Sequence, residues 1–326
     1  MKVAPAPDDT GGTPSRTRWR TAASLGIGAV MVAWVLTRVD WNAFVAQLLA
    51  LRYGAYMAFM AAFVVALLIC DVAATRYVYR STIAPVGFRE LFVVRGASYL
   101  PSLVNHHIGQ AWVTYLLSKI HGVPLARVAG ATLVVYATWA GCMLLLGAAA
   151  LWAADLPVLW AIAPLALGVA YLVLLWLRPA RLRDRRLLAP LFEAGVGGHI
   201  RALLLRIPHA AVLFVGTWVP FLFFGVDIPL ASALAYVPIL MVAVTLPLTP
   251  AGLGTRDALA ATFFEGFVAA ATHEERLAAI AAATTTTVAA ITIIDILLGL
   301  LLLPAATDLL PAAIRQQPPP PQKTAE

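Results

Sequence analysis

The stretch LPLTPAGLGTRDALAATFFEGF, residues 246–267, decides the fold expected for this chain. It lies in a long apolar region, yet two prolines and two glycines interrupt its first half, and the charged pair Arg256 and Asp257 follows them directly. Broken helices at membrane depth leave backbone N–H and C=O groups unpaired, so they occur only where they are buried in protein or line a wet cavity. The stretch therefore predicts the tip of a re-entrant helical hairpin rather than a plain membrane span.

The composition of the whole chain is that of a membrane protein. Of its 326 residues, 61% are hydrophobic and only 12% are charged, whereas about a quarter of the residues of a soluble domain carry a charge. The formal net charge of +7 comes mostly from arginine. In a membrane protein such an excess reports topology and contact with lipid headgroups. We therefore expect an all-α polytopic integral membrane protein with no nucleic-acid partner.

Six segments are apolar and long enough to span a bilayer, which takes about 20 residues: 21–37, 54–75, 126–152, 157–177, 208–225 and 277–303. Two further segments, 41–51 and 182–206, are expected to lie in the membrane interface. The first is too short to span, and the second mixes arginines with leucines at helical spacing. The chain is thus expected to have about six transmembrane helices.

The distribution of Lys and Arg predicts the orientation of these spans. Arginines precede the first span and follow the second and the fourth, whereas the loops 153–157 and 225–229 carry none. Positive loops mark the cytoplasmic side, so we expect a multi-pass protein of the inner (plasma) membrane with its N-terminus in the cytoplasm. The transmembrane domain, residues 21–305, is expected to lie between a disordered N-terminus (1–20) and a Pro-rich tail (306–326).

Two apolar regions do not fit as plain spans. Residues 91–119 have basic flanks on both ends, and residues 230–271 must enter and leave on the outer side if the C-terminal tail is cytoplasmic. Their tips, LPSLVNHHIGQAW (100–112) and LPLTPAGLGTRDA (246–258), resemble each other. We therefore expect two re-entrant hairpins that enter from opposite sides as inverted repeats, an architecture common among transporters.

The tip of the second hairpin has the features of an anion site. Gly252 and Gly254 permit close approach of the backbone. The helix that begins near Thr255 directs its N-terminal amides at the cavity, which favours a phosphate, and Arg256 adds a forked donor. The alternative is that Arg256 and Asp257 form a pair that only holds the hairpin together.

The tip of the first hairpin is polar but uncharged. Asn105, His106, His107 and Gln110 could hydrogen-bond a headgroup, take part in proton-linked gating, or simply cap the broken backbone, since histidine titrates near physiological pH. Adjacent histidines on a helix point in different directions, and the two cysteines lack metal-ligand spacing. We therefore expect no metal ion and no other cofactor.

Three charged residues lie within or beside the apolar segments. Asp71 precedes Arg76 by about one helical turn, so a local ion pair is expected. Arg95 is expected either to extend toward the interface or to line the cavity. Asp295 has no cation nearby in the sequence, and we expect it to pair with Arg256 or Arg95 and to serve in gating.

The second tip carries a family signature. The segment PAGLGTRDALAATFF resembles the P-G-G-L-G-x-R-E/D-x-A motif of the lysylphosphatidylglycerol synthase transmembrane (flippase-like) family, membrane domain only. The matching residues are Pro250, Gly252, Leu253, Gly254, Arg256, Asp257 and Ala258. Ala251 stands where a glycine is usual. The order of elements over roughly residues 20–305 is also similar, and the resemblance implies movement of a lipid or a lipid-linked amphiphile between leaflets.

The first tip departs from the P-G-R-x-G-E element of that family. Gly109 is kept, but Asn105 and His106 replace the usual proline and glycine, His107 replaces the arginine, and Gln110 replaces the acid. We therefore expect the charge pair of this half to be neutralised. Because the resemblance covers the membrane domain only, we do not expect it to imply lipid synthesis.

These features together predict a flippase-like transporter whose partner is a membrane lipid or a lipid-linked glycan, and a homo-oligomer is compatible with them. The chain lacks the Walker A, GxSxG, HExxH and dinucleotide-binding motifs, so we do not expect an enzyme. Two alternatives stay open at this point. One is a membrane-embedded transferase acting on a lipid or polyprenyl-phosphate donor, and the other is a non-transporting scaffold for envelope assembly.

Overall fold

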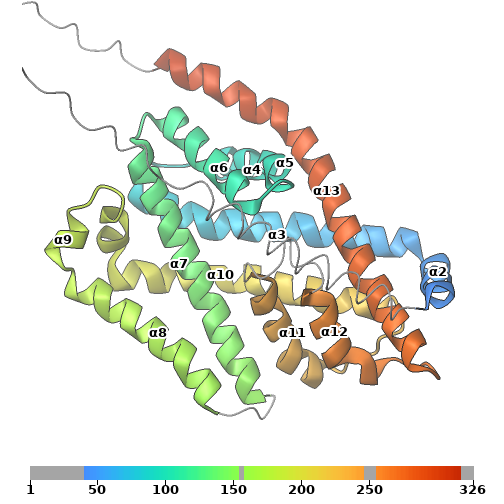
Figure 1. The fold of residues 1–326 in the computed structure, drawn as a ribbon. Coiled ribbons are helices and arrows are strands. Elements are labelled where there is room, and N and C mark those ends of the chain that lie inside the picture. The colour runs from blue at the N-terminus through green and yellow to red at the C-terminus, as the bar shows by residue number, and fades with distance from the viewer. Residues whose placement is uncertain (1–39, 154–157, 246–254, 317–326) are drawn as a thin grey trace, which may run out of the picture.

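The computed structural model describes residues 40–153, 158–245 and 255–316 (Figure 1). All its named elements within these ranges are helical, as the sequence predicts. They are α2 (Trp41–Ala50), α3 (Tyr53–Thr82), α4 (Phe88–Ala97), α5 (Tyr99–Ser102), α6 (His106–His121), α7 (Leu125–Ala153), α8 (Val158–Leu177), α9 (Ala180–Arg183), α10 (Ala189–Leu222), α11 (Leu230–Thr245), α12 (Thr255–Phe264), the 3-10 turn η2 (Glu265–Phe267) and α13 (His273–Gln316).

Four of the described helices, α3, α7, α10 and α13, are long and apolar enough to cross a membrane. Helix α8 adds 20 residues, of which Leu165–Leu177 form a further apolar stretch. On α13 the side chains of Leu297, Leu300 and Leu301 are exposed along one face. A large exposed apolar face on a long helix is the surface that a bilayer covers. The predicted first span, 21–37, lies outside the described residues.

Helix α10 overturns one expectation. Residues 182–206 were predicted to lie in the interface, but from Ala189 onward they belong to a helix of 34 residues that continues to Leu222. The helix is kinked at Gly195, where φ is 58°, a backbone conformation that glycine adopts at little cost. The prediction was wrong because Arg206, which makes the segment resemble a surface helix, is neutralised inside the protein by a carboxylate from α3.

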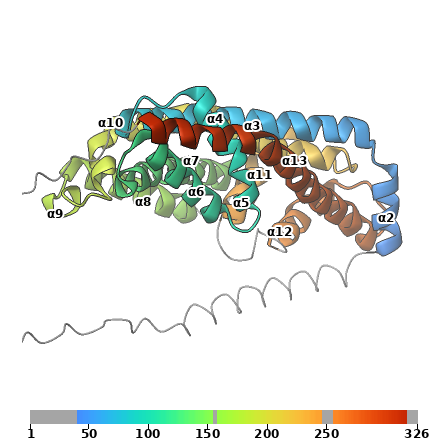
Figure 2. The ribbon, with the colours of Figure 1, turned by 90° about the horizontal axis from the view of Figure 1, so that it is seen from above.

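Helices α3 and α10 pack along each other and form the centre of the molecule. Helices α2 and α9 lie at opposite ends of it (Figure 2). Helix α13 crosses the central pair, and α7 and α8 flank α10 on the side of α9 (Figure 1). The central pair therefore contacts elements from every part of the chain.

Both regions predicted as hairpins are broken helices. The first is divided into α4, α5 and α6, and the second consists of α11 and α12 on either side of residues 246–254, which lie outside the described part. Helices α4 and α12 have 10 residues each and α6 and α11 have 16 each, which is short of the roughly 20 that a span needs. In the view of Figure 1 the two broken regions lie on opposite sides of α3.

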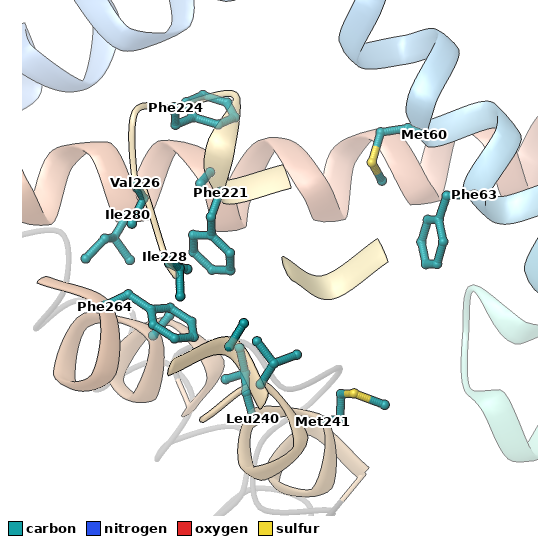
Figure 3. Close-up of a cluster of buried hydrophobic side chains, with 14 of the residues drawn as sticks. Met60, Phe63, Phe221, Phe224, Val226, Ile228, Leu240, Met241, Phe264 and Ile280 are labelled. Atoms are coloured by element: carbon teal, nitrogen blue, oxygen red, sulfur yellow. The ribbon is translucent and has the colours of Figure 1, made fainter. Parts of the chain in front are cut away.

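Each broken region has its own apolar core. Around α11 and α12 the core includes Phe221, Leu240 and Phe264, all nearly inaccessible (Figure 3). The rings of Phe221 and Phe264 meet edge to face with centroids 5.0 Å apart, which adds about 0.5–1.5 kcal/mol to their burial. A second cluster, which includes Leu91 and Leu117, joins α4 and α6 to α3 and α7. The polar groups described next lie beside these cores.

Candidate functional site

One carboxylate on α3 holds two arginines. Arg95 on α4 donates from Nε to Asp71 Oδ2 at 2.8 Å, and Arg206 on α10 donates from Nη1 to Asp71 Oδ1 at 3.1 Å. The exposed fractions of the three side chains are only 14%, 3% and 11% for Arg95, Arg206 and Asp71. With one anion and two cations, this group carries an excess positive charge inside the protein. Buried charge is costly unless it is paired and hydrogen-bonded.

Gln110 on α6 joins this group to the first broken helix. Its Oε1 accepts from Arg95 Nη1 at 3.1 Å, and its Nε2 donates to the Tyr79 hydroxyl at 3.0 Å. Tyr79 is hydrogen-bonded in turn to Thr132, 3.1 Å away, and Thr132 to Thr114 at 3.0 Å. We call Asp71, Arg95, Arg206 and Gln110 the Asp71 network; its members come from α3, α4, α6 and α10.

The network corrects one expectation and bears on two others. Asp71 does not pair with Arg76, whose Nε donates to the Val86 carbonyl at 3.1 Å instead. Arg95 does not extend toward the interface but pairs with Asp71. The tip itself is neutral at Gln110, as its sequence predicts, while Asp71, Arg95 and the unpredicted Arg206 place charges beside it from neighbouring helices.

The tip of the first broken region is built around a capped helix start. Asn105 Oδ1 accepts from the His107 backbone N–H at 2.8 Å, so the predicted capping role of Asn105 is confirmed. A Cβ on Gly109 would overlap Ser102 Oγ and lie 2.8 Å from the Ser98 carbonyl, so only glycine allows α6 to approach α5 this closely.

The two histidines of the tip lie at its exposed side. His107 Nδ1 is 3.3 Å from the Tyr136 hydroxyl on α7, and the rings of His106 and His107 are inclined at 70° with centroids 6.0 Å apart. Val104, 80% exposed, and Ile108 surround them with apolar surface. Of the four predicted tip residues, Gln110 belongs to the Asp71 network, and the other three form this exposed tip.

The second site is a cavity of about 220 Å³ beside Arg256. Its wall comes from five helices, α3, α10, α11, α12 and α13: Phe63, Leu213, Gly216, Thr217, Phe221, Leu240, Met241, Arg256, Thr284, Thr287 and Ile291. Arg256 Nε is buried without a hydrogen-bond partner among the described residues. We call this space the Arg256 cavity.

Only some of the residues predicted to surround Arg256 lie in the described part of the chain. Thr255 begins α12 and Asp257 lies in its first turn, as the sequence predicts. Gly252 and Gly254 lie outside the described residues. On the opposite wall, Thr287 is hydrogen-bonded to Tyr56 at 3.1 Å. The cavity is therefore apolar over most of its surface, with one guanidinium and a few hydroxyl groups.

The Asp71 network and the Arg256 cavity are neighbours along the same two helices. On α10, Leu213 follows Arg206 by about two turns, roughly 10 Å at 1.5 Å per residue. His209 lies between them, 8% exposed, with Nδ1 buried and unpartnered among the described residues, as is Arg206 Nε. Trp139 packs on both side chains, 5.8 Å from Arg206 Cζ and 5.2 Å from the His209 ring. Unpartnered buried polar atoms are rare and indicate a missing polar group, water or ligand.

Asp295 forms no hydrogen bond or ion pair with the residues that the structure describes. Arg95 is nevertheless close enough to interact with its carboxylate electrostatically, so the pairing of Asp295 with an arginine of the core stays a prediction. Arg95 is already engaged by Asp71 and Gln110. One turn after Asp295, a Cβ on Gly299 would meet Leu100 of α5 at 2.6 Å. Asp295 therefore lies near the face of α13 that packs against the first broken region.

The profile of the family described as "Lysylphosphatidylglycerol synthase TM region" matches residues 21–299. The chain belongs to this family. The matched range includes both broken regions, the Asp71 network and the Arg256 cavity, so the family's membrane region corresponds to nearly the whole described structure. The membership makes the chain a membrane protein of lipid-related processes. No curated protein and no solved structure matches it.

Proposed function

We propose that the protein carries a lipid or a lipid-linked amphiphile between the two leaflets of the cell membrane. The observation that carries this proposal is the buried, unpartnered Nε of Arg256 at the wall of an apolar cavity. Arg256 interacts electrostatically with Asp257, but its buried Nε–H is costly unless an acceptor such as an anion or water meets it. A lipid phosphate supplies such an anion, while the acyl chains stay in the hydrocarbon of the bilayer.

The Asp71 network is the second binding site along the proposed transport path. An anionic headgroup that leaves Arg256 meets His209 and Arg206 next along α10, and both have a buried atom free to bind it. The excess positive charge of the network favours an anion. Asp71 can then give up one arginine to the headgroup and keep the other, so neither cation is left without a partner.

The two broken regions are the moving parts of the proposed mechanism. Helix α12 directs its N-terminal amides toward the phosphate, and the exposed tip at Asn105 and His107 opens the path from the other side. Alternating access then needs only that one region closes while the other opens. The Lys and Arg bias supports a cytoplasmic N-terminus in the inner membrane.

Transport fits the Arg256 cavity better than catalysis does. Its threonine hydroxyls donate to the backbone of their own helices: Thr217 to Leu213 O, Thr284 to Ala281 O and Thr287 to Ala283 O, at 2.7–3.1 Å. A hydroxyl held in this way is not oriented toward a general base, as a nucleophile would be. The cavity thus supplies a binding group and a passage, and we propose no reaction.

Reconstitution in liposomes tests the proposal. Vesicles contain fluorescent lipids with phosphatidylglycerol, phosphatidylethanolamine or phosphatidylcholine headgroups, and a membrane-impermeant quencher reports how fast label moves between leaflets. We expect the wild type to move an anionic lipid and Arg256→Ala to do so at least tenfold more slowly. Arg80→Ala, which removes an exposed arginine at the end of α3, is the matched control. A wild type that moves none of the three lipids, or an Arg256→Ala variant as fast as wild type, would overturn it.

A further inference from the structure

A second cavity of about 190 Å³ lies between α7, α8 and α10, away from the proposed path. Its wall is almost entirely aliphatic and includes Leu144 of α7, Leu165 and Val169 of α8, and Leu203 of α10. A Cβ built on Gly168 meets nothing within 4 Å, so the space is open at this point. We call this space the α8 groove. Val169 is 60% exposed, so the groove opens on the lipid-facing side of the helices.

The groove has a polar end. His199 Nδ1 is 2.8 Å from the Gly195 carbonyl oxygen, which can only accept, so this nitrogen donates. In neutral His199, Nε2 then accepts from the Tyr171 hydroxyl at 2.9 Å. Gly195 is also the kink of α10, and a Cβ built there would lie 3.1 Å from Arg178 Nη2. The Arg178 guanidinium therefore lies about one helical turn beyond the polar end of the groove.

Arg178 is the first of a group of arginines that are close together in the sequence. Between α8 and α10 the chain carries five of them, Arg178, Arg181, Arg183, Arg185 and Arg186, with Asp184 as the acid among them. Asp184 pairs with Arg183 at 3.1 Å. The other four arginines are exposed and form no ion pair with the described residues. This end of α8 is thus an unneutralised positive surface (Figure 1, beside α9).

The position of this surface relative to the bilayer is marked by Trp176. It is 74% exposed at the last turn of α8, next to the arginines. Exposed tryptophans at helix ends are characteristic of the membrane–water interface. The arginines therefore lie at the level of the lipid headgroups, and the α8 groove extends from there into the hydrocarbon.

We infer that α7, α8 and α10 form a binding site for an anionic phospholipid, with its phosphate at Arg178 and its neighbours and one acyl chain in the α8 groove. The charge selects the headgroup, because each arginine near the surface favours an anionic over a zwitterionic lipid. Along α10, His199 lies about 10 Å before Arg206 and about 20 Å before Leu213. The groove is distinguished from the proposed transport path by α8, which lines the groove but contributes no residue to the Asp71 network or to the wall of the Arg256 cavity. The lipid is a resident one, and it packs against α8, which otherwise contacts mainly α7 and α10.

Native mass spectrometry of the full chain tests the site, with phosphatidylglycerol and phosphatidylcholine of identical acyl chains as probes. We expect wild type to bind phosphatidylglycerol at least fivefold more tightly. Gly168→Leu, which fills the groove, should weaken both lipids at least fivefold, and Arg178→Ala/Arg181→Ala should abolish the preference. The controls are Gly54→Leu, where a Cβ also meets nothing within 4 Å, and Arg80→Ala. Equal binding of the two lipids by wild type, or an unaffected Gly168→Leu variant, would overturn the inference.

A measurement on the unaltered protein guards against variants that fail to fold. Phosphatidylglycerol with a photoreactive acyl chain is crosslinked in nanodiscs, and the labelled peptides are sequenced. We expect label concentrated on α7, α8 and α10 around Leu144, Val169 and Leu203. Label spread equally over the exposed leucines of α13 would contradict the site. An Arg256→Ala variant should give the same labelling pattern, so the crosslinking result does not depend on whether the protein transports lipid.

Discussion

Asp71 and Arg206 are 135 positions apart in the sequence and are joined by a hydrogen bond of 3.1 Å between Asp71 Oδ1 and Arg206 Nη1. The contact joins α10 to α3 about two turns of α10 before the residues that line the Arg256 cavity. Because the same carboxylate also holds Arg95, its removal has a larger effect than the loss of an ordinary ion pair.

The first prediction concerns this carboxylate. Asp71→Asn leaves two arginines buried without a counter-charge, and breaking a buried pair in this way costs about 3–5 kcal/mol. We expect a markedly lower melting temperature in detergent. Asp184→Asn removes an acid from a pair whose side chains are 55% and 66% exposed, and should change stability by less than about 1 kcal/mol. Similar melting temperatures for the two variants would show that Asp71 does not hold the helices together.

The second prediction concerns Gln110. Gln110→Glu adds a negative charge beside Arg95 and brings the Asp71 network to neutrality, so we expect the fold to be retained and transport of anionic lipids to fall. Gln110→Leu deletes the bonds to Arg95 and Tyr79, which should lower stability by about 1–3 kcal/mol. The measurements are melting temperature and headgroup selectivity in liposomes. If Gln110→Glu left the ratio of the transport rates of anionic and zwitterionic lipids unchanged, the network would not be a binding site for anions on the proposed path.

The third prediction concerns the contact between α5 and α6. Gly109→Ala places a methyl group against Ser102 Oγ and the Ser98 carbonyl, and overpacking of this kind costs about 1–3 kcal/mol. We expect a lower melting temperature and slower transport. Gly54→Ala, on the first turn of α3 where a Cβ meets nothing, is the control. Because the backbone carbonyl cannot give way, adding Ser102→Gly should restore stability only in part; full recovery would locate the clash in the Ser102 side chain alone.

The sequence predicts the elements that depend on local chemistry. The break before α6 follows from Asn105, whose side chain caps this helix as expected, whereas the predicted break of the second region lies in residues 246–254, outside the described residues. The long apolar helices follow from length and hydrophobicity, and the motif around Arg256 indicates the family that the profile match establishes.

The sequence does not predict the partners of buried charges, since these are brought together from distant helices. Asp71 was assigned to Arg76 by spacing alone, although Arg95 and Arg206 hold it. Arg206 was placed in an interfacial segment because residues 182–206 mix arginines with leucines at helical spacing. One feature of the sequence does indicate that Arg206 is buried. The residues that follow Arg206, up to Leu222, are apolar except for His209 and Thr217. A charge at the start of such a run is a candidate for an internal partner.

The last prediction contrasts Asp295 with Asp71. Asp295 makes no hydrogen bond or ion pair with the described residues, in contrast to Asp71, so Asp295→Asn leaves no cation unpaired. We expect its melting temperature to equal or exceed that of wild type, because a partly buried carboxylate without an ion-pair partner is itself destabilising.

An acid without an ion-pair partner at this position points to a functional role, since intramembrane charges are usually tied to function. Asp295 lies on the helix that packs against the tip of the first broken region, next to Gly299 and Leu100. We therefore expect Asp295→Asn to slow lipid movement at least fivefold in liposomes while the fold stays intact. Asp308→Asn, farther along α13, is the control. Loss of stability in Asp295→Asn would reveal a structural partner, and unimpaired transport would remove Asp295 from the gating mechanism.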